Sequence, residues 1–180
     1  MRNRICVGID YNKDISSLFR IINMIEQTKD LVEFFKVNPA FWMHQKRSLD
    51  KVIKFLNDKN IKWIYDGKLG DVYHTNRYYA EYIYEDLGAY GATLNPYLGI
   101  KSLTPFLEYK NKKNFIVCRT SNEGSELIQK DSHEKVYSIA KETGCGLVIA
   151  GNKQGFLEEA TIKCPEVDIL CPGIGAQGGS

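Results

Sequence analysis

The stretch Ile64-Tyr65-Asp66-Gly67-Lys68-Leu69-Gly70-Asp71 places two carboxylates around one ammonium. The largely apolar run that leads into it, residues 61–65, is rich in β-forming residues and is followed by Gly67 and Gly70, so we expect a buried strand that enters a turn. Residues two apart share a face of a strand, so Asp66 and Lys68 should project the same way, with Asp71 following in the turn. An ammonium between carboxylates stays protonated and can deliver a proton to a carbanion. The alternative is a surface ion network at the end of a strand.

Length and composition favour one globular domain over residues 1–180. The chain is 43% hydrophobic and 26% charged, with a net charge of +2 and no basic block, so nothing calls for nucleic acid or an anionic membrane. No apolar run approaches the roughly 20 residues of a membrane span, and we see no signal-peptide core. The five cysteines are widely spaced, without a Cys-x-x-Cys pair. We therefore expect reduced thiols in a cytoplasmic protein.

Apolar runs alternate with amphipathic segments along the whole chain. Nearly continuous apolar strands separated by helices are typical of a parallel sheet that is covered on both sides or closed into a barrel. We expect strands over residues 4–10, 31–37, 61–65, 91–95, 114–118, 147–150 and 167–171, and helices over 14–29, 41–59, 75–87, 102–110, 133–143 and 155–163. Asp14 and Thr75 are the expected N-caps of the first and third helices, and Gly88 and Gly144 are expected stops.

Polar residues gather where the expected strands end. They are Asp10, Lys36, Asp66, Lys68, Asn95, Thr120, Ser121 and Gln177. In a (β/α)8 barrel, the carboxyl ends of the strands form the active-site face. The sequence therefore predicts an α/β protein with a (β/α)8 barrel fold. We count seven strands, so the eighth βα unit is missing from the expected set.

Lys36 lies in the otherwise apolar run Phe34-Phe35-Lys36-Val37. A buried lysine is costly unless it is paired, and Asp66 on the neighbouring expected strand is its natural partner. A lysine that simply reaches from the strand end into water is the alternative. Asp10 is either part of the same site or only a turn former at the end of its strand.

The tail Pro172-Gly-Ile-Gly-Ala-Gln-Gly-Gly offers closely spaced backbone N–H groups, as phosphate sites after the seventh strand of barrels do. A flexible chain end is the alternative. Gln177 adds a side-chain amide. The three histidines have no common spacing that predicts a metal site, and Ser121 has no histidine placed to activate it, so we expect a hydrogen-bonding role for Ser121.

Together these motifs resemble the orotidine 5′-monophosphate decarboxylase family. The matching motifs run through the chain in order: Gly8-Ile9-Asp10, Phe35-Lys36-Val37-Asn38-Pro39, Asp66-x-Lys68-x-x-Asp71 with Thr75-Asn76, Arg119-Thr120-Ser121-Asn122, and Pro172-Gly173-Ile174-Gly175-Ala176-Gln177-Gly178-Gly179. They are most similar to the branch found in some bacteria and apicomplexan-type parasites.

The resemblance implies decarboxylation of orotidine 5′-monophosphate to uridine 5′-monophosphate in a homodimer, without a cofactor or a metal. Lys68 would protonate C6, Asp66 and Asp71 would flank the departing carboxylate, and Lys36 would orient Asp66. Asp71 and Thr75 would reach into the partner's site. The implied substrate-binding residues are Asp10, Asn38 and Thr75 for the ribose, Ser121 and Thr120 for the pyrimidine, and Pro172, Gln177, Gly178 and Gly179 for the phosphate.

The resemblance also implies an eighth strand with a phosphate-clamping arginine. We expect neither in this sequence, and hence a C-terminally truncated barrel with weak phosphate affinity. One alternative is a related superfamily enzyme that uses magnesium, such as a 3-keto-L-gulonate 6-phosphate decarboxylase or a hexulose-phosphate synthase. The acidic residues that would hold magnesium in such an enzyme are incomplete in this sequence, because Glu33 is the only acid on the second expected strand. Another is a catalytically silent nucleotide-binding product.

Overall fold

The computed structural model describes residues 4–11 and 17–174. The proposed cap Asp14 and the tail residues Gln177, Gly178 and Gly179 therefore lie outside the described residues. Seven strands form one sheet in chain order, and the printed registers of β1–β2, β2–β3, β5–β6 and β6–β7 are parallel. They are β1 (Cys6–Gly8), β2 (Phe34–Val37), β3 (Trp63–Leu69), β4 (Gly91–Leu94), β5 (Lys113–Arg119), β6 (Gly146–Ile149) and β7 (Ile169–Leu170).

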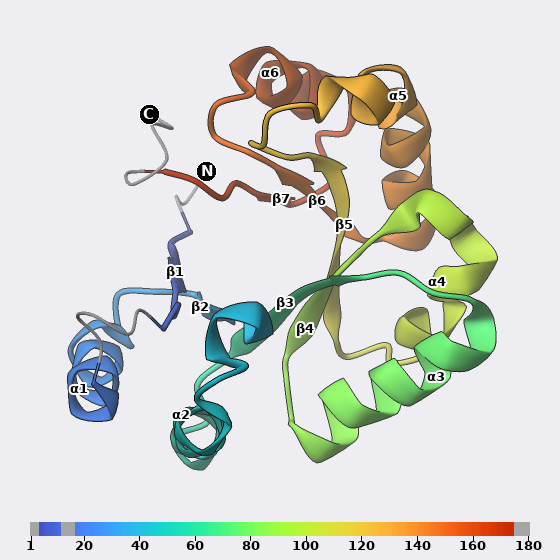
Figure 1. Cartoon of the computed structure of the whole chain (residues 1–180). Helices are drawn as coiled ribbons and strands as arrows, with labels where there is room; N and C mark the ends of the chain where they lie inside the picture. The colour runs from blue at the N-terminus through green and yellow to red at the C-terminus, as the bar shows by residue number, and fades with distance from the viewer. Residues whose placement is uncertain (1–3, 12–16, 175–180) are drawn as a thin grey trace. The chain divides into compact units, whose positions relative to one another are not determined.

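Helices alternate with these strands along the chain (Figure 1). The α-helices are α1 (Leu18–Thr28), α2 (Lys46–Asp58), α3 (Tyr73–Glu81), α4 (Ile100–Leu107), α5 (Glu126–Thr143) and α6 (Gln154–Lys163), with short 3₁₀ segments η1 (Pro39–Trp42) and η3 (Pro96–Leu98) and a π-turn η2 (Tyr82–Asp86). This succession confirms the predicted α/β fold with seven βα-type strands. The described helices include none that is both long and apolar enough to cross a membrane.

The chain divides into two compact units, Met1–Gly67 with Glu81–Ala92, and Lys68–Ala80 with Thr93–Ser180. We call them unit 1 and unit 2. The expectation of a single domain over residues 1–180 stays a prediction.

Unit 1 contains β1, β2 and most of β3, with α1 and α2 packed side by side (Figure 1). Its core side chains are fully or almost fully buried: Ile25, Phe35, Trp42, Val52, Leu56, Trp63 and Ile64. The apolar positions of α1 and α2 recur at helical spacing, so each helix presents one stripe to this core. Ser17 caps α1 by accepting a hydrogen bond from the Arg20 amide at 3.2 Å.

Unit 2 contains β5, β6 and β7, covered by α5 and α6, which lie beside each other in Figure 1. The Tyr137 hydroxyl of α5 donates to the Phe156 carbonyl of α6 at 3.2 Å. β6 is buried along its whole length and β5 along most of it, as the continuous apolar runs predicted, with Ile116, Leu147 and Ile149 fully buried.

One long helix over residues 41–59 was the wrong expectation. Asn38 instead accepts from the Ala40 amide at 3.0 Å and caps the 3₁₀ turn η1, and α2 begins only at Lys46. The reason is a distant contact: the buried Trp42 indole donates to the Ile9 carbonyl at 3.0 Å, which fixes the turn against β1.

Two further helix starts differ from expectation. Thr75 is not an N-cap, because the Asn76 amide already donates to the Val72 carbonyl at 3.0 Å and α3 begins at Tyr73. Helix α5 begins at Glu126 and not near residue 133, since Glu126 is held by the Arg119 side chain at the end of β5. The expected stops are confirmed, with Gly88 and Gly144 in the left-handed region at φ 72° and 71°.

Candidate active site

A buried ion pair joins β2 to β3 in unit 1. The register places Lys36 opposite Ile64, so Asp66, two residues further along β3, shares the face of Lys36. The Lys36 Nζ lies 2.7 Å from Asp66 Oδ2, and their side chains are only 14% and 6% exposed. The predicted pairing of Lys36 with Asp66 is confirmed. Both charges are therefore fixed before any ligand arrives.

Asp10 lies close to the same pair. Gly8 is opposite Lys36 in the β1–β2 register. A Cβ added to Gly8 would lie 3.7 Å from Asp10 Oδ2 and 3.9 Å from Lys36 Nζ, so the carboxylate and the ammonium flank the same glycine. The carboxyl ends of β1, β2 and β3 thus gather three alternating charges, and Asp10 is more than an isolated turn former.

The Cys6 thiol lies near this cluster, two residues before Gly8 on β1. Burial raises the pKa of Cys6 to about 11, with Lys36 lowering it and Asp66 raising it by smaller amounts. A thiol with this pKa is almost entirely protonated at neutral pH, and only the thiolate is a nucleophile. We therefore assign Cys6 to packing.

Lys68 lies in unit 2, near the end of β3, and its backbone is not extended. Its φ is 48°, in the left-handed region, and its N–H donates to Thr93 Oγ1 at 2.9 Å. The expected common direction of Asp66 and Lys68 assumed an extended strand with a period of two residues. The backbone at Lys68 departs from that extended geometry, and the common direction of the two side chains stays a prediction.

The turn that carries Asp71 is held by a buried amide. Asn76 is fully buried, and its Nδ2 donates both to the Asp71 carbonyl at 2.8 Å and to the Ser102 carbonyl at 2.6 Å. The Asp71 carboxylate accepts from the Val72 amide at 2.7 Å, and Thr75 is partly buried in the first turn of α3. Sequence reasoning quoted Asn76 in a motif but missed this anchoring role.

The loop after β5 presents Thr120 and Ser121. The backbone amide of Thr120 donates to Gln129 Oε1 at 2.8 Å, and the Thr120 hydroxyl donates to Asn122 Oδ1 at 2.5 Å. The Ser121 carbonyl accepts from Asn152 Nδ2 at 3.4 Å, and Ser121 is exposed. The hydrogen bonds hold the loop backbone and leave Ser121 facing solvent.

Arg119, the last residue of β5, anchors the start of the loop that carries Thr120 and Ser121, a role that sequence reasoning missed. Its side chain is fully buried, lies 3.8 Å from the centre of the Phe156 ring and donates from Nη2 to both Glu126 oxygens at 2.6 and 2.5 Å. Lys153 also donates to Glu126, at 2.5 Å. The hydrogen bonds from Lys153 and Arg119 lower the pKa of Glu126 to about 2. The apolar run into Arg119 was the available signal, because a buried arginine needs an acidic partner.

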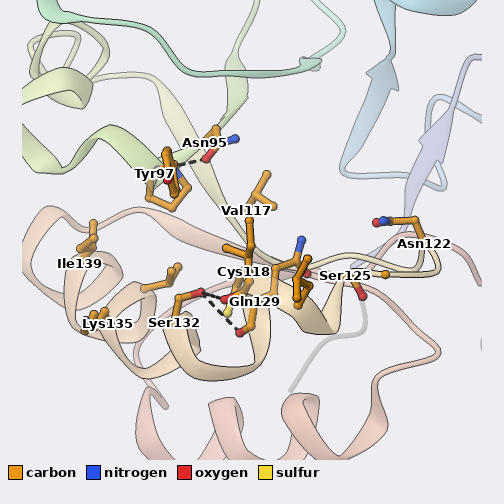
Figure 2. A pocket seen from close by; sticks show the side chains of 15 residues that line it. Asn95, Tyr97, Val117, Cys118, Asn122, Ser125, Gln129, Ser132, Lys135 and Ile139 are labelled. Carbon is orange, nitrogen blue, oxygen red and sulfur yellow. Dashed lines mark hydrogen bonds between the residues drawn. The ribbon is translucent and has the colours of Figure 1, made fainter.

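A cavity of about 690 Å³ lies in unit 2 between the segment after β4 and helix α5. Figure 2 shows Asn95 and Tyr97 on one side, Gln129, Ser132 and Lys135 of α5 on another, and Asn122 and Ser125 at the loop. It borders the Thr120–Asn122 loop but is lined by neither Thr120 nor Ser121.

The remaining expected residues are divided between the units. Asn38, in unit 1, is occupied as the cap of η1, while the Pro172 carbonyl in unit 2 accepts from the Gly151 amide at 2.9 Å and fixes the chain after β7. Within unit 1 the structure brings together Asp10, Lys36 and Asp66, and within unit 2 it places Thr120 beside Ser121 on one loop.

One group of side chains has the donor types of a metal site. Ligand atoms of His133, Glu134 and Glu159 lie within 4.8 Å of one another. However, the Lys163 ammonium already bonds both carboxylates, at 2.5 and 2.7 Å. The Lys163 ammonium already lies between the two carboxylates and bonds both, so we assign no metal to the group.

A parallel βα succession with charged side chains at the carboxyl ends of its strands defines a barrel-type α/β enzyme. More narrowly, the chain belongs to the orotidine 5′-phosphate decarboxylase / HUMPS family, whose sequence model matches residues 3–180.

Named relatives agree with this membership. The orotidine 5′-phosphate decarboxylase of Dehalococcoides mccartyi (strain ATCC BAA-2266) is 32% identical over 198 residues, covering 97% of this chain and 73% of that protein. The enzyme of the same name from Herpetosiphon aurantiacus is 31% identical over 208 residues, covering 99% and 76%.

Solved structures with the same fold include Leishmania donovani UMP synthase, with a TM-score of 0.86 and 32% identity over 97% of this chain and 43% of that one. A putative orotidine-monophosphate decarboxylase from Toxoplasma gondii has a TM-score of 0.85 and 26% identity over 97% and 75%. Bacterial and Toxoplasma gondii members are thus among the proteins to which this chain is similar.

Proposed function

We propose that this chain is a lyase that converts orotidine 5′-monophosphate to uridine 5′-monophosphate, the last step of pyrimidine synthesis. The observation that carries the proposal is the buried Lys36–Asp66 pair with Asp10 beside it, at the strand ends of a chain that belongs to this family. Neither a metal nor a cofactor takes part in the proposed reaction.

The chemical step requires a proton donor for the carbanion that forms at C6 when carbon dioxide leaves. We assign that role to Lys68. Asp66 and Asp71 flank the departing carboxylate, and Lys36 holds Asp66 in place through the 2.7 Å ion pair. A carboxylate fixed in this way cannot turn toward water, so its charge acts on the substrate without reorganisation.

The other assigned residues bind the rest of the substrate. Binding energy from the distant phosphate is used to orient the pyrimidine, so these residues affect the reaction even though they are remote from C6. We assign Asp10, Asn38 and Thr75 to the ribose, Thr120 and Ser121 to the pyrimidine, and Pro172, Gln177, Gly178 and Gly179 to the phosphate.

We further propose a cytoplasmic homodimer in which Asp71 and Thr75 enter the partner's site. Asp71 is partly exposed on a turn that Asn76 holds rigid, which is suitable for a residue presented to a second subunit. All five cysteines are free thiols, in agreement with a reducing compartment.

The test is loss of orotate absorbance with the purified chain and orotidine 5′-monophosphate, run beside Lys68→Ala. A positioned general acid contributes about 10²- to 10⁴-fold, so kcat should fall at least ~100-fold. Lys54→Ala is the matched control, because this lysine is 74% exposed on α2 and should leave kcat unchanged.

Three outcomes are informative. Turnover that survives a chelator separates this reaction from that of a magnesium-dependent relative. A chain without any decarboxylation of this substrate would contradict the proposal. Equal activity of the parent chain and Lys68→Ala would remove the proton-donor assignment.

A further inference from the structure

Lys68 has a backbone conformation that a lysine in a strand rarely adopts. Among the described residues, the non-glycine residues with positive φ are Asn60 and Lys68, at 53° and 48°. Asn60 lies in the turn after α2, and asparagine tolerates this region because its short side chain bonds locally. Lysine has no such compensation. Something outside the residue must hold Lys68 there, and such strain is concentrated at functional sites.

The neighbouring strand β4 stabilises this backbone conformation of Lys68. The Lys68 N–H donates to the side-chain hydroxyl of Thr93, at 2.9 Å, and Thr93 is fully buried in β4. On the next residue, the Leu69 carbonyl accepts from the Asn95 amide at 2.6 Å. Gly70 approaches Asn95 so closely that a Cβ at Gly70 would lie 2.8 Å from Asn95 Cβ. Three consecutive residues from the end of β3 are therefore in contact with β4 or with Asn95, the residue after β4, and the first of these contacts is to the Thr93 side chain.

We propose that Thr93 is a positioning residue for Lys68: its hydroxyl holds the Lys68 backbone in the left-handed conformation and thereby sets the direction in which the lysine side chain leaves β3. The inference rests on the proposed role of Lys68 as proton donor. It adds a residue that acts through the Lys68 backbone.

The chemistry of Thr93 suits this role. The Lys68 N–H lies in the peptide plane that joins residue 67 to Lys68, so a hydrogen bond to it fixes the plane from which the Lys68 φ angle is measured. A backbone N–H needs an acceptor, and here the acceptor is the hydroxyl of Thr93 and not a carbonyl of the sheet ladder. A threonine hydroxyl can accept, and its β-branched side chain is stiff at χ1, so the acceptor has a fixed position. The other three residues of β4 are Gly91, Ala92 and Leu94. Valine would fill the same space in this apolar strand, so the hydroxyl is the feature that needs a reason.

The direction of the Cα–Cβ bond matters because a general acid must lie within hydrogen-bond reach of the atom that it protonates. A lysine has a long and flexible stem, and fixing its base reduces the volume that the ammonium searches. A displacement of about 1 Å at a reacting group can cost about 100-fold in rate.

The experiment compares Thr93→Val with Thr93→Ser in the decarboxylation assay. Thr93→Val keeps the shape and removes the acceptor, so we expect kcat to fall ~10- to 100-fold while KM changes less than ~2-fold, because the ground-state contacts of the substrate remain. Thr93→Ser keeps the hydroxyl and should retain kcat within ~3-fold. Thr161→Val on α6 removes a threonine hydroxyl that bonds the Leu157 carbonyl at 2.8 Å, and should match the parent chain.

A merely structural role for Thr93 would lower the thermal midpoint of both variants without separating kcat from KM. The inference is overturned if Thr93→Val keeps the parent kcat, or if Thr93→Ser loses as much as Thr93→Val. Should Thr93→Val not fold, Thr93→Ala replaces it with the same expectation.

A crystal structure of Thr93→Val decides the point independently of turnover. A Lys68 φ that stays near +48° would overturn the inference, and a φ that returns to the extended region supports it. Lys68→Ala in the same assay tests the proposed function itself, so full activity of Lys68→Ala and full activity of Thr93→Val are separate failures.

Discussion

Replacing Asp66 by Asn tests how much the buried Lys36–Asp66 pair contributes to the stability of the chain. The substitution keeps the volume and one carbonyl acceptor, but it leaves the Lys36 ammonium, 14% exposed, without its counter-charge at 2.7 Å. Removing one partner of a buried pair typically costs about 3–5 kcal/mol. The remaining acceptor and the neighbouring Asp10 carboxylate reduce the penalty, so we expect about 3 kcal/mol.

The chain provides a control, a solvent-exposed lysine–aspartate pair with the same N–O distance. Lys54 and Asp58 on α2 also have an N–O distance of 2.7 Å, but their side chains are 74% and 58% exposed. Asp58→Asn should therefore cost less than about 1 kcal/mol, because exposed pairs gain little and are screened. The two variants differ in burial and not in chemistry or in contact distance.

The assay is urea unfolding with linear extrapolation, with the requirement that the slope stays the same in all variants. The double variant Lys36→Met with Asp66→Leu should regain most of the loss, since no buried charge remains unpaired. An Asp66→Asn variant no less stable than Asp58→Asn would refute the reasoning, and so would a double variant as unstable as the single one.

Two further predictions concern unit 2. The pKa of Glu126 falls from 4.5 to about 2 on folding, so its contribution to stability is present above pH ~4.5 and is lost as the pH falls toward 2. Glu126→Gln should therefore show a smaller decline of the thermal midpoint over that pH interval than the parent chain. An unchanged decline would argue against the hydrogen bonds from Lys153 and Arg119 as its cause. Gly70→Ala should destabilise by about 1–3 kcal/mol, because its Cβ would lie 2.8 Å from Asn95 Cβ. Gly155→Ala on α6 meets nothing within 4 Å and should stabilise by up to about 1 kcal/mol, so equal unfolding free energies for the two alanine variants would contradict the packing argument.

The sequence predicted those features that local pattern and the cost of burial determine. Continuous apolar runs placed the seven strands to within a few residues. The partner of Lys36 was predictable across 30 residues, because an apolar strand cannot bury an ammonium alone and the neighbouring strand offered one carboxylate at its end.

Other features depend on contacts that no local pattern contains. The break before α2 depends on the Trp42 indole bonding the Ile9 carbonyl, 33 residues away. The early start of α5 depends on Glu126 meeting a buried Arg119. Both are cases in which a tertiary contact overrides helix propensity.

The left-handed backbone of Lys68 is the most informative of these misses. A period of two residues along β3 assigns Asp66 and Lys68 to one face, and the reasoning is sound only while the backbone stays extended. Asp66 is fixed by a side chain of β2, and the Lys68 backbone by a side chain of β4.

Asp66 and Lys68 are two residues apart on β3, and they are thus held by different neighbouring strands. The Asp66 carboxylate and the Lys68 backbone are each held by a partner residue, as the proposed preorganised charge array requires. The proposed role of Thr93 therefore predicts that the Asp-x-Lys spacing alone does not define the site. A chain with Asp66, Lys68 and a valine at position 93 would keep the motif and lose the acceptor that holds the lysine backbone.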